Sequence, residues 1–171
     1  MREAGTRYFV SHPPVALERV VAEINVDMIG ANRAPGSPDK DAQGATGPNE
    51  VYVTGPQVLS TGTAALLDEV NRSYLNLRIN SDHDRADRES FYPRTDAGPF
   101  LERGVLAIGW TTGMHARYHL PSDEARYLDP GKMESIARTI YVFAWTLADR
   151  AERPKIDKPM PSIVPDYRGR E

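Results

Sequence analysis

Hydrophobic and polar residues alternate between Val20 and Met28. The apolar residues fall mostly on one side of this stretch, and Glu23, Asn25 and Asp27 fall on the other. A period of two predicts a β-strand. Because Gly30 ends the run, Asp27 lies at the carboxyl end of the predicted strand, which is where open α/β sheets bind ligands. The alternative is that Asp27 only begins a turn.

Two shorter apolar runs predict further strands. Val51 to Thr54 is rich in β-formers and is closed by a Gly-Pro pair, and Val105 to Trp110 follows a glycine. Between the first and second predicted strands, Ala31 to Glu50 contains many prolines and glycines and little apolar material. We therefore expect a long excursion there, without regular structure.

Helical spacing appears in three places. Thr63 to Leu77 carries apolar residues at intervals of three and four, and Thr95 or Asp96 can cap a short helix that follows. Asp129 is a typical N-cap, since Pro130 comes directly after it. Beyond it, an apolar stripe predicts a helix of about five turns that packs on the sheet. Its aromatic residues are predicted to pack as well; they are Tyr141, Phe143 and Trp145.

The alternation of strands and helices predicts an α/β fold. A length of 171 residues suits one domain, which we place at residues 1–153. Residues 154–171 are rich in proline and are predicted to form an extended or disordered surface tail.

Composition excludes several classes of function. A net charge of −3 gives no basic excess for nucleic acid binding. No apolar run approaches the roughly 20 residues of a membrane span, and the first ten residues lack the apolar core of a signal peptide. The chain has no cysteine, so any zinc would be held by His, Asp and Glu.

The segment from Gly113 to Asp123 concentrates the reactive side chains. His115 and His119 are four residues apart, a spacing that places two imidazoles on one helix face. However, a glycine and a proline bracket the pair and no apolar stripe accompanies it, so we predict a loop. One imidazole can then bind a metal while the other packs or points into a pocket. The plain alternative is an ordinary polar surface loop.

A second polar run, Asn80 to Asp87, contains Asp82, His83 and Asp84. Alternating oxygen and nitrogen donors are compatible with a metal site. We interpret this run instead as a solvated loop that follows a helix.

Several motifs together resemble the dizinc aminopeptidase family, which includes bacterial leucyl aminopeptidases and relatives of glutamate carboxypeptidase. The motifs are Glu23 to Gly30, Thr95 to Phe100 with the Gly-Val that follows, and Thr112 to Asp123, and the helix from Asp129 also fits. They cover most of residues 7–155 in the family order. Ala97 departs from the pattern, since the family usually has histidine there.

The resemblance implies a fold and a set of site residues. The fold would be a partial three-layer sandwich, with a mixed, mostly parallel sheet flanked by helices and without the N-terminal strands of the full domain. Asp27 would be a carboxylate ligand of one zinc ion, His119 an imidazole ligand of the other, and Tyr118 a hydrogen-bond donor to the oxyanion. Asp96 and Asp123 would orient ligands, or only cap the structures that follow them.

Other side chains near this loop are candidates for lining the substrate pocket: Trp110, Met114 and His115. In the family, two metal ions about 3.5–4 Å apart share a hydroxide that attacks the peptide carbonyl. The resemblance also implies a peptide substrate and a periplasmic or secreted location.

The family's remaining ligands are not in this sequence. A His-x-Asp pair and an adjacent Glu-Glu pair supply them upstream in the family, and Arg2 to Phe9 resembles the segment that follows the Glu-Glu pair. We therefore expect this chain to be the carboxyl-terminal part of a peptidase, which alone binds zinc poorly and does not hydrolyse peptides. The missing strands would leave a sheet edge exposed, so we also expect a dimer or higher oligomer.

Two other functions stay open. The chain can be a non-catalytic binding or assembly module of the same fold. It can also be an independent hydrolase whose metal site combines His115 and His119 with Asp82, His83 and Asp84.

Overall fold

The computed structural model describes residues 3–36, 44–87, 91 and 95–161. Its elements are α1 (Ala4–Ser11), the 3₁₀ turn η1 (Leu17–Arg19), β1 (Glu23–Val26), β2 (Glu50–Thr54), α2 (Pro56–Leu59), α3 (Thr61–Ser73), β3 (Arg78–Asn80), α4 (Ala97–Leu101), β4 (Ala107–Thr111), the 3₁₀ turn η3 (Ala125–Tyr127) and α5 (Pro130–Ala148). The chain is an α/β protein, as the alternation of patterns predicts.

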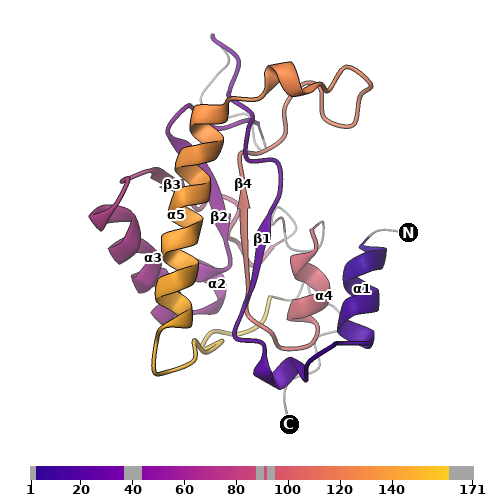
Figure 1. Cartoon of the computed structure of the whole chain (residues 1–171), viewed down its shortest axis with the longest axis vertical. Helices are drawn as coiled ribbons and strands as arrows, with labels where there is room; N and C mark the ends of the chain where they lie inside the picture. The colour runs from indigo at the N-terminus through magenta and orange to yellow at the C-terminus, as the bar shows by residue number, and fades with distance from the viewer. Residues whose placement is uncertain (1–2, 37–43, 88–90, 92–94, 162–171) are drawn as a thin grey trace.

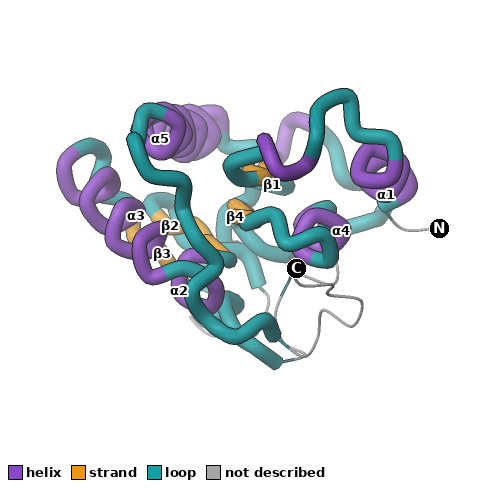
Figure 2. Tube along the Cα trace, turned by 90° about the horizontal axis from the view of Figure 1, so that it is seen from below, coloured by secondary structure: helices purple, strands orange, loops and turns teal. Residues whose placement is uncertain are grey.

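One mixed sheet of four strands, in the order β1-β4-β2-β3, organises the molecule. β1 runs parallel to β4, and β2 runs parallel to β3, whereas β2 and β4 are antiparallel. α5 and α3 cover one face, and α4 lies against β4 and β1 with α1 beside it (Figures 1 and 2). The mixed sheet between helices confirms the predicted fold class.

The core lies between α5 and the sheet. Phe143 of α5 and Trp110 of β4 are 0% and 1% exposed, and their ring centroids are 5.9 Å apart. At the start of α5 the Asp129 carboxylate accepts a hydrogen bond from the Lys132 amide at 3.0 Å. This is the predicted N-cap, because a helix leaves its first amides without backbone partners.

Two of the predicted packing aromatics are instead exposed. Tyr141 and Trp145 are each 64% exposed, and only Phe143 packs in the core. The three residues cannot share one face of a helix. Phe143 is two residues from each of the other two, so its side chain points about 160° away from theirs. Tyr141 and Trp145 are four residues apart and differ in direction by only about 40°. The prediction that all of them pack was therefore wrong for Tyr141 and Trp145.

The prediction of a solvated loop at residues 80–87 was also wrong in part. Asn80 belongs to β3, and His83 and Asp84 are each 6% exposed. The Asp84 carboxylate accepts hydrogen bonds from the Gly55 amide at 2.8 Å and the Gln57 amide at 2.5 Å. It satisfies amides at the start of α2, so a polar residue is buried at low cost.

The remaining differences concern the ends of the chain and its longest connection. The apolar patch near Tyr8 belongs to α1, which ends at Ser11, just before the His-Pro-Pro sequence. Residues 37–43 of the predicted excursion and residues 162–171 of the predicted tail lie outside the described residues. In residues 154–161 the chain has no helix or strand, and the Asp157 carboxylate accepts a hydrogen bond from the Thr61 amide.

None of the helices in the described part of the chain is long and apolar enough to cross a bilayer.

Candidate functional site

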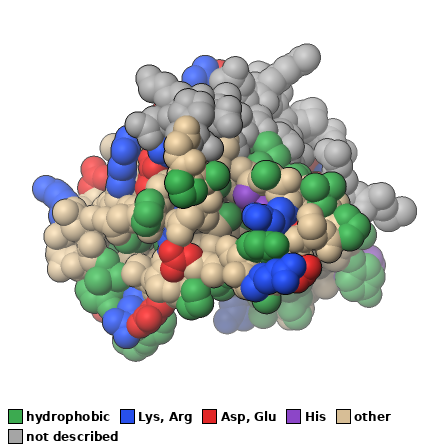
Figure 3. Space-filling view, turned by 90° about the horizontal axis from the view of Figure 1, so that it is seen from above, with side chains coloured by type: hydrophobic (Ala, Val, Ile, Leu, Met, Phe, Trp, Pro, Cys, Tyr) green, Lys and Arg blue, Asp and Glu red, His purple; other side chains and the backbone are tan. Residues whose placement is uncertain are grey.

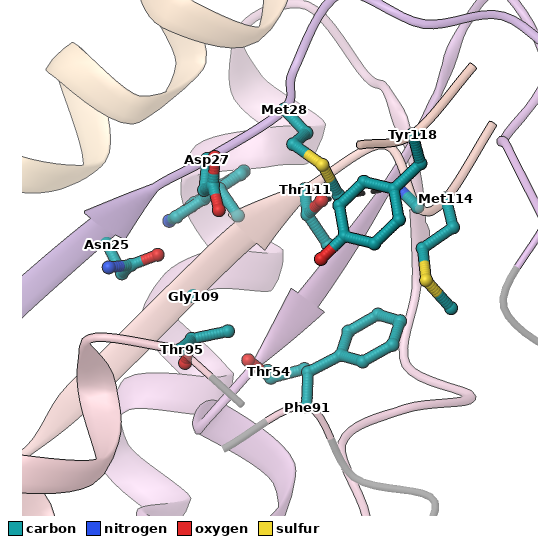
Figure 4. A pocket seen from close by; sticks show the side chains of 12 residues that line it. Asn25, Asp27, Met28, Thr54, Phe91, Thr95, Gly109, Thr111, Met114 and Tyr118 are labelled. Atoms are coloured by element: carbon teal, nitrogen blue, oxygen red, sulfur yellow. Dashed lines mark hydrogen bonds between the residues drawn. The ribbon is translucent and has the colours of Figure 1, made fainter. Parts of the chain in front are cut away.

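A pocket opens beside the carboxyl ends of β1 and β4 (Figure 4). It is lined by Asn25, Asp27, Met28, Thr54, Phe91, Thr95, Gly109, Trp110, Thr111, Gly113, Met114 and Tyr118. Two of the three residues to which the resemblance assigns direct roles, Asp27 and Tyr118, therefore share one pocket. Methionine and aromatic side chains supply most of its apolar wall, and Asp27 supplies a carboxylate.

The turn after β1 places Asp27. The Asp27 amide donates to the Trp110 carbonyl at 3.1 Å and so extends the parallel ladder by one residue. Met28 then has φ 55°, in the left-handed region that a residue with a side chain rarely adopts. Thr112, which is fully buried, holds this turn: its amide donates to the Met28 carbonyl at 3.0 Å, and its hydroxyl accepts from the Ala31 amide at 3.2 Å.

Lys132 ties the same turn to α5. Its side chain is 4% exposed, and Nζ donates to the Ala31 carbonyl at 2.8 Å, the Thr46 hydroxyl at 2.9 Å and the Gly47 carbonyl at 2.8 Å. Burial lowers the pKa of the Lys132 ammonium to about 8. The Asp129 amide adds a bond to the Gly30 carbonyl at 2.9 Å. The Asp27 turn is thus held from both β4 and α5.

The loop after β4 forms the other wall of the pocket. Gly113 has φ +84°, and a Cβ atom there would lie 2.4 Å from the Gly44 carbonyl oxygen, so only glycine fits without displacement. Gly44 forms an isolated bridge with Met114, and the Tyr118 amide donates to the His115 carbonyl at 2.9 Å. These contacts bring Met114 and Tyr118 to the pocket, and the segment is a loop, as predicted.

His119 lies next to the pocket but does not line it. The residue is exposed and has φ 60°, and its ring stacks on Tyr118 with centroids 3.8 Å apart. Figure 3 looks onto this end of the molecule and shows hydrophobic side chains among Lys and Arg side chains. The imidazole of His119 is therefore accessible beside the pocket residue Tyr118, and it does not line the pocket with Asp27.

Asp96 and Asp123, which were expected to orient metal ligands or to cap the structures that follow them, each contact a side chain that does not line the pocket. His115 Nε2 is 3.7 Å from the Asp123 carboxylate, and His115 Nδ1 accepts a hydrogen bond from the Arg117 amide at 3.3 Å. Asp96 occupies the N-cap position of α4 without a capping bond, and its carboxylate accepts a hydrogen bond from the Thr6 hydroxyl. Of the pocket candidates, Trp110 and Met114 line the pocket and His115 does not.

The segment from Asp82 to Asp84 does not join these histidines. The His83 ring stacks on Phe91 at 4.1 Å and meets the Tyr52 ring edge-on at 4.7 Å. Across the described residues, no group of three or more His, Cys, Asp or Glu side chains is arranged to hold a metal ion. The independent hydrolase built on His115, His119 and residues 82–84 therefore finds no support.

Sequence reasoning missed Glu23 and Phe91. Glu23 projects from the same side of β1 as Asn25 and Asp27, and alternation along the strand was the signal that could have marked it. Its Oε2 is buried without a hydrogen-bond partner among the described residues, and burial raises the pKa of the Glu23 carboxyl to about 7. Phe91 lines the pocket from a polar segment that carries no periodic signal.

A model described as Peptidase family M28 matches residues 3–144. This chain belongs to peptidase family M28. The match confirms the family that the motifs indicated, and it spans both the Asp27 turn and the loop that carries Tyr118 and His119.

Solved structures agree with this membership at the level of the fold. The chain is similar to the LapA aminopeptidase of Legionella pneumophila, with a TM-score of 0.64 and 19% identity over 88% of this chain and 37% of LapA. It is also similar to BSAP, a zinc aminopeptidase from Bacillus subtilis, with a TM-score of 0.59 and 14% identity over 92% of this chain and 36% of BSAP. A search of curated proteins finds no match.

Little more than a third of each related chain is thus represented here. Zinc is implied for the M28 family, and the carboxylate of Asp27 and the imidazole of His119 are donors that suit it. Two such donors do not fill a tetrahedral site, and the described residues include no larger group. Within this chain, the donor chemistry fits zinc but the number of donors does not.

Proposed function

We propose that this M28 chain is the carboxyl-terminal part of a zinc-dependent aminopeptidase-type metallopeptidase and contributes half of its active site. The observation that carries the proposal is the shared pocket of Asp27 and Tyr118, at the carboxyl ends of β1 and β4 of an M28 fold. When bound, the metal pair of the complete centre supplies an activated hydroxide for attack on a peptide carbonyl.

Asp27 acts as a metal ligand in this proposal. Its carboxylate follows a strand end that Thr112 holds on one side and Lys132 on the other. Such a rigid position lowers the cost of ordering a ligand when the metal arrives. His119 supplies an imidazole from the adjacent loop, and its exposed ring leaves it accessible to donors from another segment.

Tyr118 acts on the substrate. Its ring projects into the pocket, with the phenol directed toward the interior (Figure 4). A phenol can donate a hydrogen bond to the negative oxygen that develops when a peptide carbonyl is attacked. Stacking on His119 at 3.8 Å restricts the ring, so the donor is oriented before the substrate binds.

The complete active centre needs groups that this chain does not supply. Further ligands and the general base come from protein outside these 171 residues, as the family's His-x-Asp and Glu-Glu pairs imply. The chain alone therefore binds zinc weakly and does not hydrolyse peptides. Tight stoichiometric zinc together with leucyl-anilide hydrolysis by the isolated chain would refute this part.

The test is reconstitution. The reading frame upstream of Met1 is examined for the His-x-Asp and Glu-Glu pairs. The protein that it encodes, which we call the upstream product, is then mixed with the chain in the presence of zinc, and the mixture is assayed for hydrolysis of a leucyl-anilide. We expect hydrolysis that falls by roughly 100-fold in kcat for Tyr118→Phe, the loss typical of one oxyanion donor. Tyr74→Phe, on the exposed surface of the chain, serves as the control and should retain full activity. An inactive mixture, or an upstream product without those pairs, favours the non-catalytic module instead.

A further inference from the structure

A second pocket lies at the opposite end of α5 from the loop that carries Tyr118 and His119. The start of α3, the end of α5 and the segment 150–157, which is yellow in Figure 1, form its walls. The cavity volume is about 200 Å³. One water molecule needs about 10–15 Å³, and pockets for drug-sized molecules have about 300–1,000 Å³. The size therefore suits a small ligand. We name this cavity the α3–α5 pocket.

The segment 150–157 is held in place along its length. Its first residues continue directly from α5, and at its other end the Asp157 amide donates to the Leu59 carbonyl at 3.1 Å. The Asp157 carboxylate accepts from the Thr61 amide at 2.9 Å. Between these ends, the Arg153 guanidinium donates to the Glu18 carbonyl. The α3–α5 pocket is thus formed by fixed backbone, so the side chains that line it are positioned before a ligand binds.

Positive charge exceeds negative charge in the lining of the α3–α5 pocket. Three cationic side chains stand against two carboxylates; they are Arg150, Arg153 and Lys155, against Glu152 and Asp157. Among the described residues, Arg150 and Lys155 have no ion-pair partner. The bond from the Thr61 amide lowers the pKa of the Asp157 carboxyl, so this carboxylate already has a donor of its own. The balance of charge favours an anion.

Two buried hydroxyls in the same lining have a proton to spare. Ser60 and Thr63 are each 1% exposed, and both line the α3–α5 pocket. The Ser60 hydroxyl oxygen accepts from the Thr63 amide at 3.3 Å and from the Thr63 hydroxyl at 2.9 Å. Of the two hydroxyl protons, this arrangement uses one, and the Ser60 proton has no acceptor among the described residues. Since an undonated buried hydroxyl is costly, the pocket is suited to a ligand that accepts hydrogen bonds.

We propose that the α3–α5 pocket binds a small anion with several negatively charged oxygens, of the chemical class that includes phosphates and polycarboxylates. Arg150 and Lys155 balance its charge, and Ser60 donates its spare proton to one of its oxygens. Guanidinium and ammonium groups form strong, charge-assisted hydrogen bonds with such oxygens. The α3–α5 pocket shares no residue with the pocket of Asp27 and Tyr118, so this ligand is independent of the proposed peptidase function.

Inorganic phosphate is the probe for the first experiment. Its affinity for the whole chain is measured by titration calorimetry, in metal-free buffer at constant ionic strength. We expect saturable binding of about one phosphate ion per chain, and at least about tenfold weaker binding of acetate, which carries a single charge. The measurement needs neither zinc nor the upstream product, so its result is separate from that of the reconstitution.

Four variants test the charges, and all four side chains are exposed, so each variant should fold. Arg150→Gln and Lys155→Gln should each weaken phosphate binding about tenfold, the loss typical of one charge-assisted hydrogen bond. Arg138→Gln is the matched control, because Arg138 lies on α5 outside the pocket, paired with Glu134 at 2.8 Å; we expect a change within about twofold. Glu152→Gln removes a negative charge from the lining and should tighten binding about threefold.

Amide hydrogen exchange locates the bound anion. We expect slower exchange in residues 59–63 and 150–157 with phosphate, and no change in residues 113–118. Citrate in a parallel titration separates the two sources: tighter binding of phosphate assigns the pocket to a phosphorylated molecule, and tighter binding of citrate assigns it to a polycarboxylate.

Three results would overturn the proposal. The first is the absence of saturable binding for both phosphate and citrate. The second is an equal loss of affinity for Arg138→Gln and the two pocket variants, which would mean that the anion senses only the total charge. The third is weaker phosphate binding by Glu152→Gln, or protection confined to residues 113–118.

Discussion

Glu23→Gln should stabilise the protein at neutral and alkaline pH and leave it unchanged in acid. Burial raises the pKa of the Glu23 carboxyl from 4.5 to about 7, and the nearby charge of Asp96 adds to the effect. Oε2 has no hydrogen-bond partner among the described residues. An ionised Glu23 is therefore a desolvated and incompletely paired charge.

The sign and size follow from linkage. Between pH 4.5 and 7 the folded state holds a proton that the unfolded state has released, so the free energy of unfolding falls as pH rises. The difference between the pKa of about 7 in the folded state and 4.5 in the unfolded state corresponds to a loss of about 3 kcal/mol, at most, in the free energy of unfolding. Because the side chain keeps some contact with water, we expect about 2 kcal/mol. Glutamine keeps the shape of the side chain and cannot ionise, so it removes this loss.

Urea unfolding of the chain and of Glu23→Gln measures the effect, with the fluorescence of buried Trp110 as the signal. At pH 8 the variant should be more stable by about 2 kcal/mol, and at pH 4 the two should agree within about 0.5 kcal/mol. An equal difference at both pH values would show that packing, and not ionisation, separates the proteins. A variant that is less stable at pH 8 would refute the reasoning outright.

Two further substitutions test how the site is held. Asp129→Ala removes the N-cap of α5 and the hydrogen-bond acceptor of the Asn32 side-chain amide. It should lower the free energy of unfolding, measured by heat or urea, by about 1–2 kcal/mol. No loss of stability would mean that α5 does not need its cap. Lys132→Met removes the Nζ donor that the Ala31 carbonyl, the Thr46 hydroxyl and the Gly47 carbonyl share, and it should cost about 3 kcal/mol, with faster amide exchange in residues 28–33. Unchanged exchange there would show that Lys132 does not anchor the turn after β1.

Strong local signals made much of this fold predictable. The Asp-Pro start of α5 and the alternation in β1 each combine a local preference with burial on one side, so they identify their elements directly. The three-residue strand β3 and α1 carry no comparable pattern, because their structure depends on neighbours that are distant in sequence. The burial of Asp84 likewise depends on amides near residue 55, which no local pattern connects to it.

The site was predictable where a motif coincided with a strand end. Asp27 and Tyr118, which the resemblance to the family singled out, line one pocket, and their roles stay predictions. The depth of the pocket and its wall at Phe91 depend on tertiary packing, which the motifs do not contain. Asp123 was predicted either to orient a ligand or only to cap the turn that follows it. Its carboxylate lies 3.7 Å from His115 Nε2, and its role stays a prediction.

The exposed face of α5 shows a limit of hydrophobic pattern. Tyr141 and Trp145 read as packing residues in the sequence, and they are exposed in the chain as described. Hydrophobicity predicts that a residue is buried by something, but not that the partner lies in the same 171 residues.

Zinc content tests the central claim most directly. The purified chain, its Asp27→Asn and His119→Gln variants, and each of these mixed with the upstream product are dialysed against zinc and analysed for bound metal. We predict less than about 0.1 zinc ion per chain for the chain alone, about two per complex with the unmodified chain, and a clear loss of bound zinc for either variant. Two tightly bound zinc ions in the isolated chain, or full occupancy in a complex that contains either variant, would contradict this prediction.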